Sequence, residues 1–248
     1  MSDAAPPPRD QVREATILRQ VQEALAASNV AGAIEIARKA LSDGFAHPML
    51  LNLRSFWLEQ QGRDDDALAD LALAVSMAAG DPLVSNAYGL QLAKMNRRAE
   101  SVAAFQKTIS LDPNFAPAHF NLGWANEAVG DLEGSRRSHE RAIALNPKFP
   151  QALAHLANLA ARRGDWDQAR GFADRALELD PGELLALRAK ATAAVAEGQF
   201  DDAERFIARI MGDPRVPVLD RAIADSVLGD LRHAQSRYAE AFAAYRDG

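Results

Sequence analysis

The sequence repeats itself with a period of 34 residues, and this spacing limits the folds open to the chain more than any other feature. Glycine or asparagine falls on the same place in the register at Gly62, Asn96, Gly130, Gly164 and Gly198. Pairs of Asp or Asn with Pro recur in the same way at residues 112–113, 146–147 and 180–181. Periods of this length are typical of solenoids, in which each repeat packs mainly against its neighbours.

Two columns of mostly small residues share this period. One contains Ala33, Ala67, Ser101, Ser135, Ala169 and Ala203, and the other contains Val21, Ser55, Gly89, Gly123, Ala157 and Ala191. Small side chains at fixed helical positions allow two helices to approach closely, while apolar residues at helical spacing fill the rest of the interface. Proline ends one helix and a left-handed glycine or asparagine ends the other. Each period therefore predicts a helix, a turn and a second helix.

Residues 120–147, FNLGWANEAVGDLEGSRRSHERAIALNP, resemble the tetratricopeptide repeat. The family pattern of Leu-Gly, Gly-Asp, a small residue, Ala and Pro is met by Leu122-Gly123, Gly130-Asp131, Ser135, Ala142 and Pro147. Residues 156–181 meet the same pattern, and the resemblance extends over nearly the whole chain. It implies an all-α fold, a right-handed α-α superhelix of about six to seven helix-turn-helix repeats.

The period also gives expected boundaries. We expect a flexible arm at residues 1–9 and a repeat array at 10–248. The repeats are expected at 14–47, 48–81, 82–115, 116–149, 150–183 and 184–217, with a partial repeat at 218–248. Four residues are inserted before the last repeat, and we place them around MGDPRVPVLD (residues 211–220). Because Phe242 and Tyr245 would lack a packing neighbour, Gly248 is interpreted as a fragment boundary rather than a natural end.

Composition argues against several function classes. The chain has no cysteine, a formal net charge of -6 and a sequence pI of about 5.4. A nucleic-acid partner is not expected because such binders usually carry a basic face. No membrane association is expected, since no apolar stretch reaches about 18 residues. The five histidines and the acidic runs show no catalytic or metal-binding spacing, so we expect no cofactor, no metal and no enzyme activity in this chain. The cytoplasm is the expected location.

The resemblance implies a concave groove lined by the second, fifth, ninth and twelfth positions of each repeat. The residues expected in or beside this partner-binding groove are Phe56, Asn86, Leu90, Phe120, Asn121, Trp124, Glu127, His155, Asn158 and Arg162. Trp124 is the main candidate anchor, because aromatic residues dominate binding hot spots; the alternative is that it packs on a neighbouring helix. The cations of a carboxylate clamp are missing, so an extended or helical peptide is the expected guest.

Residues 213–245 also resemble the last repeat ahead of the catalytic domain in bacterial tetratricopeptide-sulfotransferase proteins. Leu228-Gly229 and the run from Tyr238 to Phe242 carry this likeness. Two hypotheses therefore stand. The chain is either a scaffold that binds a peptide or protein partner, or the substrate-recognition region of a longer sulfotransferase with a C-terminal catalytic domain.

Overall fold

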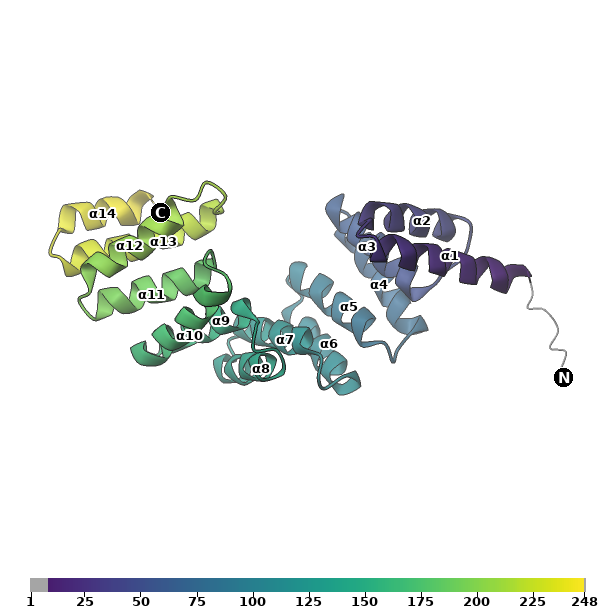
Figure 1. Cartoon of the computed structure of the whole chain (residues 1–248), viewed down its shortest axis with the longest axis horizontal. Coiled ribbons are helices and arrows are strands. Elements are labelled where there is room, and N and C mark those ends of the chain that lie inside the picture. Colours follow the sequence, from purple (N-terminus) through teal and green to yellow (C-terminus); the bar gives the residue numbers. More distant parts are fainter. Residues whose placement is uncertain (1–8, 248) are drawn as a thin grey trace. The chain divides into compact units, whose positions relative to one another are not determined.

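The computed structural model describes residues 9–247, and over this range it contains fourteen α-helices and no strand (Figure 1). The helices up to residue 129 are α1 (Arg9–Ala26), α2 (Val30–Ser42), α3 (Pro48–Gln60), α4 (Asp64–Met77), α5 (Pro82–Lys94), α6 (Arg98–Leu111) and α7 (Ala116–Val129). Those that follow are α8 (Leu132–Leu145), α9 (Pro150–Arg162), α10 (Trp166–Leu179), α11 (Leu184–Ala196), α12 (Phe200–Met211), α13 (Val218–Ala234) and α14 (Tyr238–Asp247). The predicted all-α fold of successive helix pairs is confirmed.

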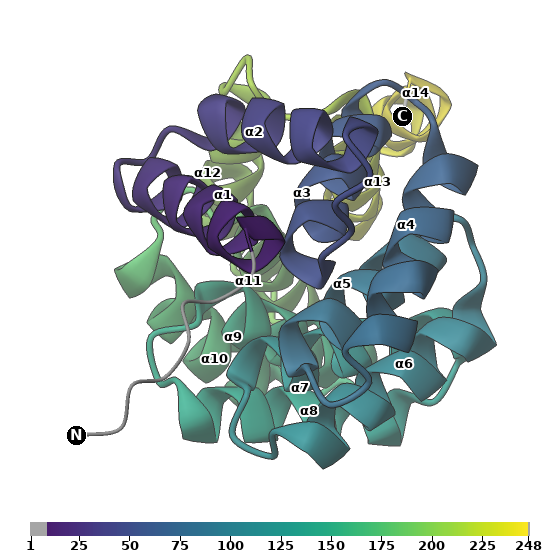
Figure 2. The same ribbon diagram turned by 90° about the vertical axis from the view of Figure 1, so that its right-hand side faces the viewer.

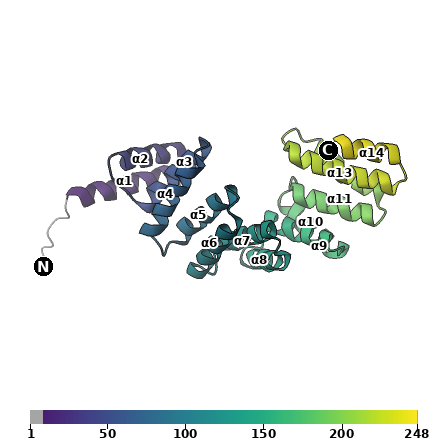
Figure 3. The ribbon, with the colours of Figure 1, turned by 180° about the vertical axis from the view of Figure 1, so that it is seen from behind.

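The chain forms two compact units, Met1–Val129 and Gly130–Gly248, and each is described by itself. In the first unit, each helix from α1 to α7 packs on the next, as the pairs α1–α2 and α3–α4 show in Figure 2. In the second unit α9 packs on α10 and α11, and α13 packs on α14 (Figure 3). The predicted arm at residues 1–9 lies outside the described residues except for Arg9, which begins α1.

The turns within the helix pairs share one backbone conformation. Gly62, Gly130, Gly164 and Gly198 all have positive φ values, between 69° and 84°, and Asn96 has φ 59°. Glycine adopts this left-handed conformation without a steric penalty, and asparagine tolerates it. Ser28 and Ser236 occupy the same turn in the first and last pairs, with φ values of 57° and 61°. These two were not recognised from sequence because serine is not a usual left-handed residue, although Ser28 lies 34 residues before Gly62.

Both columns of small residues are buried, as the period predicts. The column from Ala33 to Ala203 is at most 1% exposed at every position. In the other column, Gly89 gives the clearest reason for a small residue. A Cβ atom on Gly89 would lie 2.7 Å from Cε1 of Phe105, a ring that is fully buried. The close approach of α5 and α6 therefore depends on the absence of a side chain at Gly89.

The helix interfaces of each unit form separate apolar clusters. In the first unit, Val21, Ala33 and Leu50 join α1, α2 and α3, and Leu51 and Val84 join α3 to α5 through α4. In the second unit, Leu153 of α9 lies among alanines of α9, α10 and α11. A further cluster joins α11, α12 and α13 around Leu231. Each cluster includes residues from consecutive helices, as expected for a fold stabilised by neighbour contacts.

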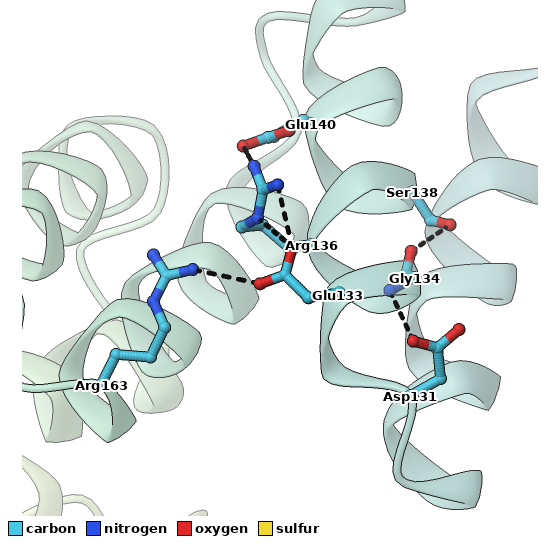
Figure 4. A network of polar contacts seen from close by, with 7 residues as sticks. All are labelled: Asp131, Glu133, Gly134, Arg136, Ser138, Glu140 and Arg163. Carbon is cyan, nitrogen blue, oxygen red and sulfur yellow. Dashed lines mark hydrogen bonds and ion pairs between the residues drawn. The ribbon is translucent and has the colours of Figure 1, made fainter.

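The start of α8 illustrates how polar groups fix a helix end (Figure 4). The Oδ1 atom of Asp131 accepts the backbone N–H of Gly134 at 2.8 Å, which satisfies one of the free donors of the first turn. Arg136 donates to both Glu133 and Glu140, at 3.0 and 2.6 Å. The hydrogen bonds from Arg136 to Glu133 lower the pKa of that carboxyl group. Arg163, at the end of α9, lies 3.7 Å from the same glutamate.

His47 caps α3 and gives the fold a dependence on pH. Its Nδ1 atom accepts the backbone N–H of Met49 at 3.2 Å, so the cap requires a neutral ring. Burial lowers the pKa of His47, and the nearby Glu14 carboxylate partly opposes this. The folded state therefore binds the proton less readily than the unfolded chain. The contribution of the cap is complete above the unfolded pKa of 6.5 and is lost as pH falls through the lower folded pKa.

We expect His47→Asn, which keeps a capping side chain without a titrating ring, to remove this dependence. Between about pH 7.5 and pH 5, the wild type should lose up to about 1 kcal/mol of unfolding free energy relative to the variant. Urea unfolding of both proteins across this range, followed by circular dichroism, measures the difference. Parallel pH profiles for the two proteins would show that His47 does not act as a neutral cap.

The four inserted residues mainly lengthen a helix. The α12–α13 connection spans residues 212–217, within the segment predicted for the insertion, and α13 has 17 residues where α11 has 13. Arg221 holds the connection in place by donating to the backbone oxygens of Val216 and Asp213. Asp213 also accepts hydrogen bonds from the side chain and backbone of Arg215, which lower its pKa to about 2.

Candidate functional site

A row of exposed apolar side chains runs along the first helices of three successive pairs in the first unit. Phe56 on α3, Leu90 on α5 and Trp124 on α7 lie 34 residues apart and thus occupy the same helical position. Helix α5 contacts both α3 and α7, so the three positions lie on helices that touch in sequence. The exposed fractions are 48% for Phe56 and 42% for Trp124, and Leu90 is partly exposed. We call these three residues the apolar row.

Trp124 keeps a large part of its side chain accessible. A tryptophan that only packed on a neighbouring helix would be largely buried, whereas this side chain leaves two fifths of its surface accessible. Leu83, in the first turn of α5, adds a further exposed apolar side chain, 59% accessible. Large exposed apolar residues that gather on one surface, unlike single scattered ones, mark interaction sites.

The amides beside the row pair with each other. Nδ2 of Asn121 donates to Oδ1 of Asn86 at 2.9 Å, which ties α7 to α5. Asn121 is only 8% exposed, whereas Asn86 is partly exposed. Asn86 keeps its Nδ2 group for other acceptors, so it is better placed than Asn121 to meet a guest backbone. Phe120 and Glu127, also expected at the groove, are partly buried on α7.

In the second unit the corresponding helix, α9, presents polar side chains. Asn158 takes the position of the row, and its Oδ1 atom accepts Nη2 of Arg188 from α11 at 3.3 Å. Arg162 is exposed in the last turn of α9. Thr192, which lies 34 residues after Asn158 and so takes the same position in the next repeat, is also polar. The three apolar members of the row therefore all lie in the first unit.

His155 lies in a contact that sequence reasoning missed. Its ring stacks on that of His139, with centroids 4.8 Å apart and planes tilted by 26°. His139 is fully buried. The two residues are 16 apart and lie on α8 and α9, so no local motif links them. The 16-residue offset between facing helices of adjacent pairs is the signal that could have found them.

Glu183, in the second unit, has a carboxyl group whose pKa is changed by burial. Burial raises its pKa, while a hydrogen bond from the backbone N–H of Ala186 to Oε2, at 2.7 Å, acts in the opposite direction. That bond caps the first turn of α11, so the role of Glu183 is structural.

The site as a whole offers apolar surface, aromatic rings and amides, which suit recognition of a polypeptide. Across residues 9–247, none of the helices is both long and apolar enough to cross a membrane.

This architecture of consecutive helix pairs, each closed by a left-handed turn, defines a solenoid of tetratricopeptide type. Residues 104–224 match models of the tetratricopeptide repeat: one model matches residues 128–191 and 160–224, and a second matches residues 104–137. A search of curated proteins found no match.

Solved structures share the fold at low sequence identity. PilF from Pseudomonas aeruginosa is 19% identical, with a TM-score of 0.71 over 86% of this chain and 96% of that chain. PilW, a type IV pilus biogenesis factor, is 20% identical, with a TM-score of 0.68 over 83% and 95%. YrrB, a tetratricopeptide protein with an unusual peptide-binding site, is 16% identical, with a TM-score of 0.55 over 71% and 89%. These likenesses establish the tetratricopeptide solenoid fold.

Proposed function

We propose that the chain is a protein-interaction scaffold whose first unit binds an apolar segment of a peptide or protein partner on the apolar row. The observation that carries the proposal is the exposure of Phe56 and Trp124 at equivalent positions of neighbouring helices. A peptide laid across these helices would bury both rings, and aromatic anchors supply much of the energy of such interfaces. The free Nδ2 group of Asn86 would donate to a guest carbonyl.

Two observations support this proposal without identifying the partner. Each ring has only two rotatable side-chain bonds, so little side-chain entropy is lost on binding. YrrB, which shares the fold, is described as having a peptide-binding site. We also propose a reducing location such as the cytoplasm, because the chain has no cysteine. The likeness to sulfotransferase-linked repeats stays a hypothesis from sequence alone.

Trp124→Ala should weaken binding of a partner peptide by about 2 kcal/mol, because the exposed indole is the largest anchor of the row. The probe is a peptide selected from a random twelve-residue phage library on the wild-type protein, labelled with fluorescein and titrated by anisotropy. Phe56→Ala should also weaken binding, by a smaller amount. Circular dichroism of both variants should match that of the wild type.

Leu73→Ala is the matched control, because Leu73 is similarly exposed, at 46%, but lies on α4 outside the row. It should bind the selected peptide as the wild type does. The proposal fails if folded Trp124→Ala binds with unchanged affinity, or if the control weakens binding equally.

A further inference from the structure

A pocket with a volume of about 670 Å³ lies in the first unit, between α2, α3 and α4. None of the members of the apolar row lines it. Trp57, the residue after Phe56 of the row, lines the pocket instead. One residue along a helix is a rotation of about 100°, so the two side chains leave the helix in different directions. The pocket is therefore distinct from the apolar row, and an inference about it does not depend on the groove. Its size falls within the range of ligand-binding clefts, about 300–1,000 Å³.

The wall of the pocket presents an arginine stacked on a tryptophan. The Cζ atom of Arg38 lies 3.7 Å from the centre of the Trp57 ring. Stacking uses the flat face of the guanidinium group and leaves its in-plane N–H donors available for a planar acceptor. Holding the guanidinium in place also reduces the entropy lost when an anion binds. Lys39, the next residue of α2, lines the same pocket.

The acidic residues of the pocket are mostly neutralised within it. Asp70 accepts two hydrogen bonds from Arg54, at 2.6 and 2.7 Å, which raise the pKa of Arg54. Asp66 accepts one from Arg63 at 2.7 Å. Among the described residues, Arg38 and Lys39 form no ion pair, and Glu35 is the one remaining carboxylate of the lining.

The pocket therefore differs in charge from the rest of the protein. Its lining carries four cationic and three acidic side chains, a net charge of one positive unit, in a chain of formal net charge -6. The two unpaired cations are adjacent in sequence, and the partly exposed indole of Trp57 provides apolar surface beside them. This combination matches a ligand in which carboxylates and apolar side chains lie close together.

We propose that this pocket binds an acidic segment of a protein partner. Carboxylates of the segment accept hydrogen bonds from Arg38 and Lys39, and an adjacent apolar side chain rests on the exposed part of Trp57. The Arg54–Asp70 ion pair holds the wall of the pocket and is not itself a contact to the guest. Because the guest is held by exposed charges, its affinity falls as salt rises.

The test uses a fluorescein-labelled eight-residue peptide of alternating glutamate and leucine, titrated by anisotropy into the whole chain. Binding is expected for this peptide and not for its counterpart with glutamine in place of glutamate. Combined Arg38→Gln and Lys39→Gln should weaken binding by about tenfold or more. Lys39→Glu, which leaves the Arg38–Trp57 stack in place, should weaken it at least as much as Lys39→Gln. Binding should also weaken between roughly 50 and 300 mM NaCl.

The matched control combines Arg137→Gln and Lys148→Gln, two exposed cations outside the pocket, and changes the net charge by the same amount. It should keep binding within about twofold of the wild type. Equal loss in the control, or unchanged binding in the pocket variants, overturns the proposal. A labelled oligothymidylate provides a further comparison. If it binds as tightly and loses affinity in the same variants, the pocket is a general polyanion site and the proposal is wrong.

Discussion

Replacing Phe105 by alanine is expected to lower the free energy of unfolding by about 3–5 kcal/mol, in the range of large-to-small changes at buried aromatic positions. The side chain is fully buried and its ring fills the space over Gly89, where α5 approaches α6. Removing it leaves a cavity that the backbone of two packed helices cannot readily close. Urea unfolding followed by circular dichroism measures the loss.

A double-mutant cycle with Gly89 tests the reason for this effect. Gly89→Ala alone should cost about 1–3 kcal/mol, because the added Cβ atom would clash with the Phe105 ring. In the Phe105→Leu background the same change should cost less, since a smaller side chain leaves room and alanine favours the helix by about 1 kcal/mol. Additive effects of the two changes would contradict direct packing of the ring on Gly89.

Leu153→Ala should destabilise the second unit by about 3–5 kcal/mol, in the upper part of the range for buried leucines. Leu153 is 0% accessible, and the other buried residues of its cluster are alanines of α9, α10 and α11. Alanine has no rotatable side chain with which to fill a cavity, so the space left by the leucine closes only as far as the partly buried Ile143, Phe172, Leu177 and Leu185 can move into it. Hydrogen exchange of α9–α11 amides, read with urea unfolding, locates and measures the loss.

Leu153→Met is the matched control, because it conserves volume in a flexible side chain and should cost less than about 1.5 kcal/mol. A similar and small loss in both variants would mean that the cluster repacks around the site. A large loss in both would mean that side-chain shape, rather than the cavity, sets the stability there.

The turns and interfaces of the fold could be predicted because they use residues with a strict local requirement. A left-handed turn favours glycine or asparagine, and a close helix crossing excludes a large side chain. Such positions recur in sequence at the period of the fold, so Gly62 and Ala33 are informative even without a structure. Ser28 and Ser236 limit this kind of prediction, because they adopt the left-handed turn conformation although serine does not favour it.

The polar contacts of the sites could not be predicted in the same way. The hydrogen bond between Asn121 and Asn86 depends on the rotamers of two side chains on different helices. The stack of Arg38 on Trp57 depends on how α2 and α3 cross. The position of Trp124 on its helix could be predicted, but its exposure could not, because exposure depends on how the folded helices pack.

The length of the insertion before α13 has a geometric consequence. Four residues in an α-helix amount to one full turn and about 40° more. Residues beyond the added turn therefore keep nearly the same angular phase as their counterparts in other repeats. Val227 and Leu231 accordingly pack on α11 and α12, the two helices that Ala224 contacts earlier in α13. An insertion of two residues would rotate that surface by about 200° and point it away from its partner helix, so a whole turn is the smallest addition that lengthens the helix and preserves its contact.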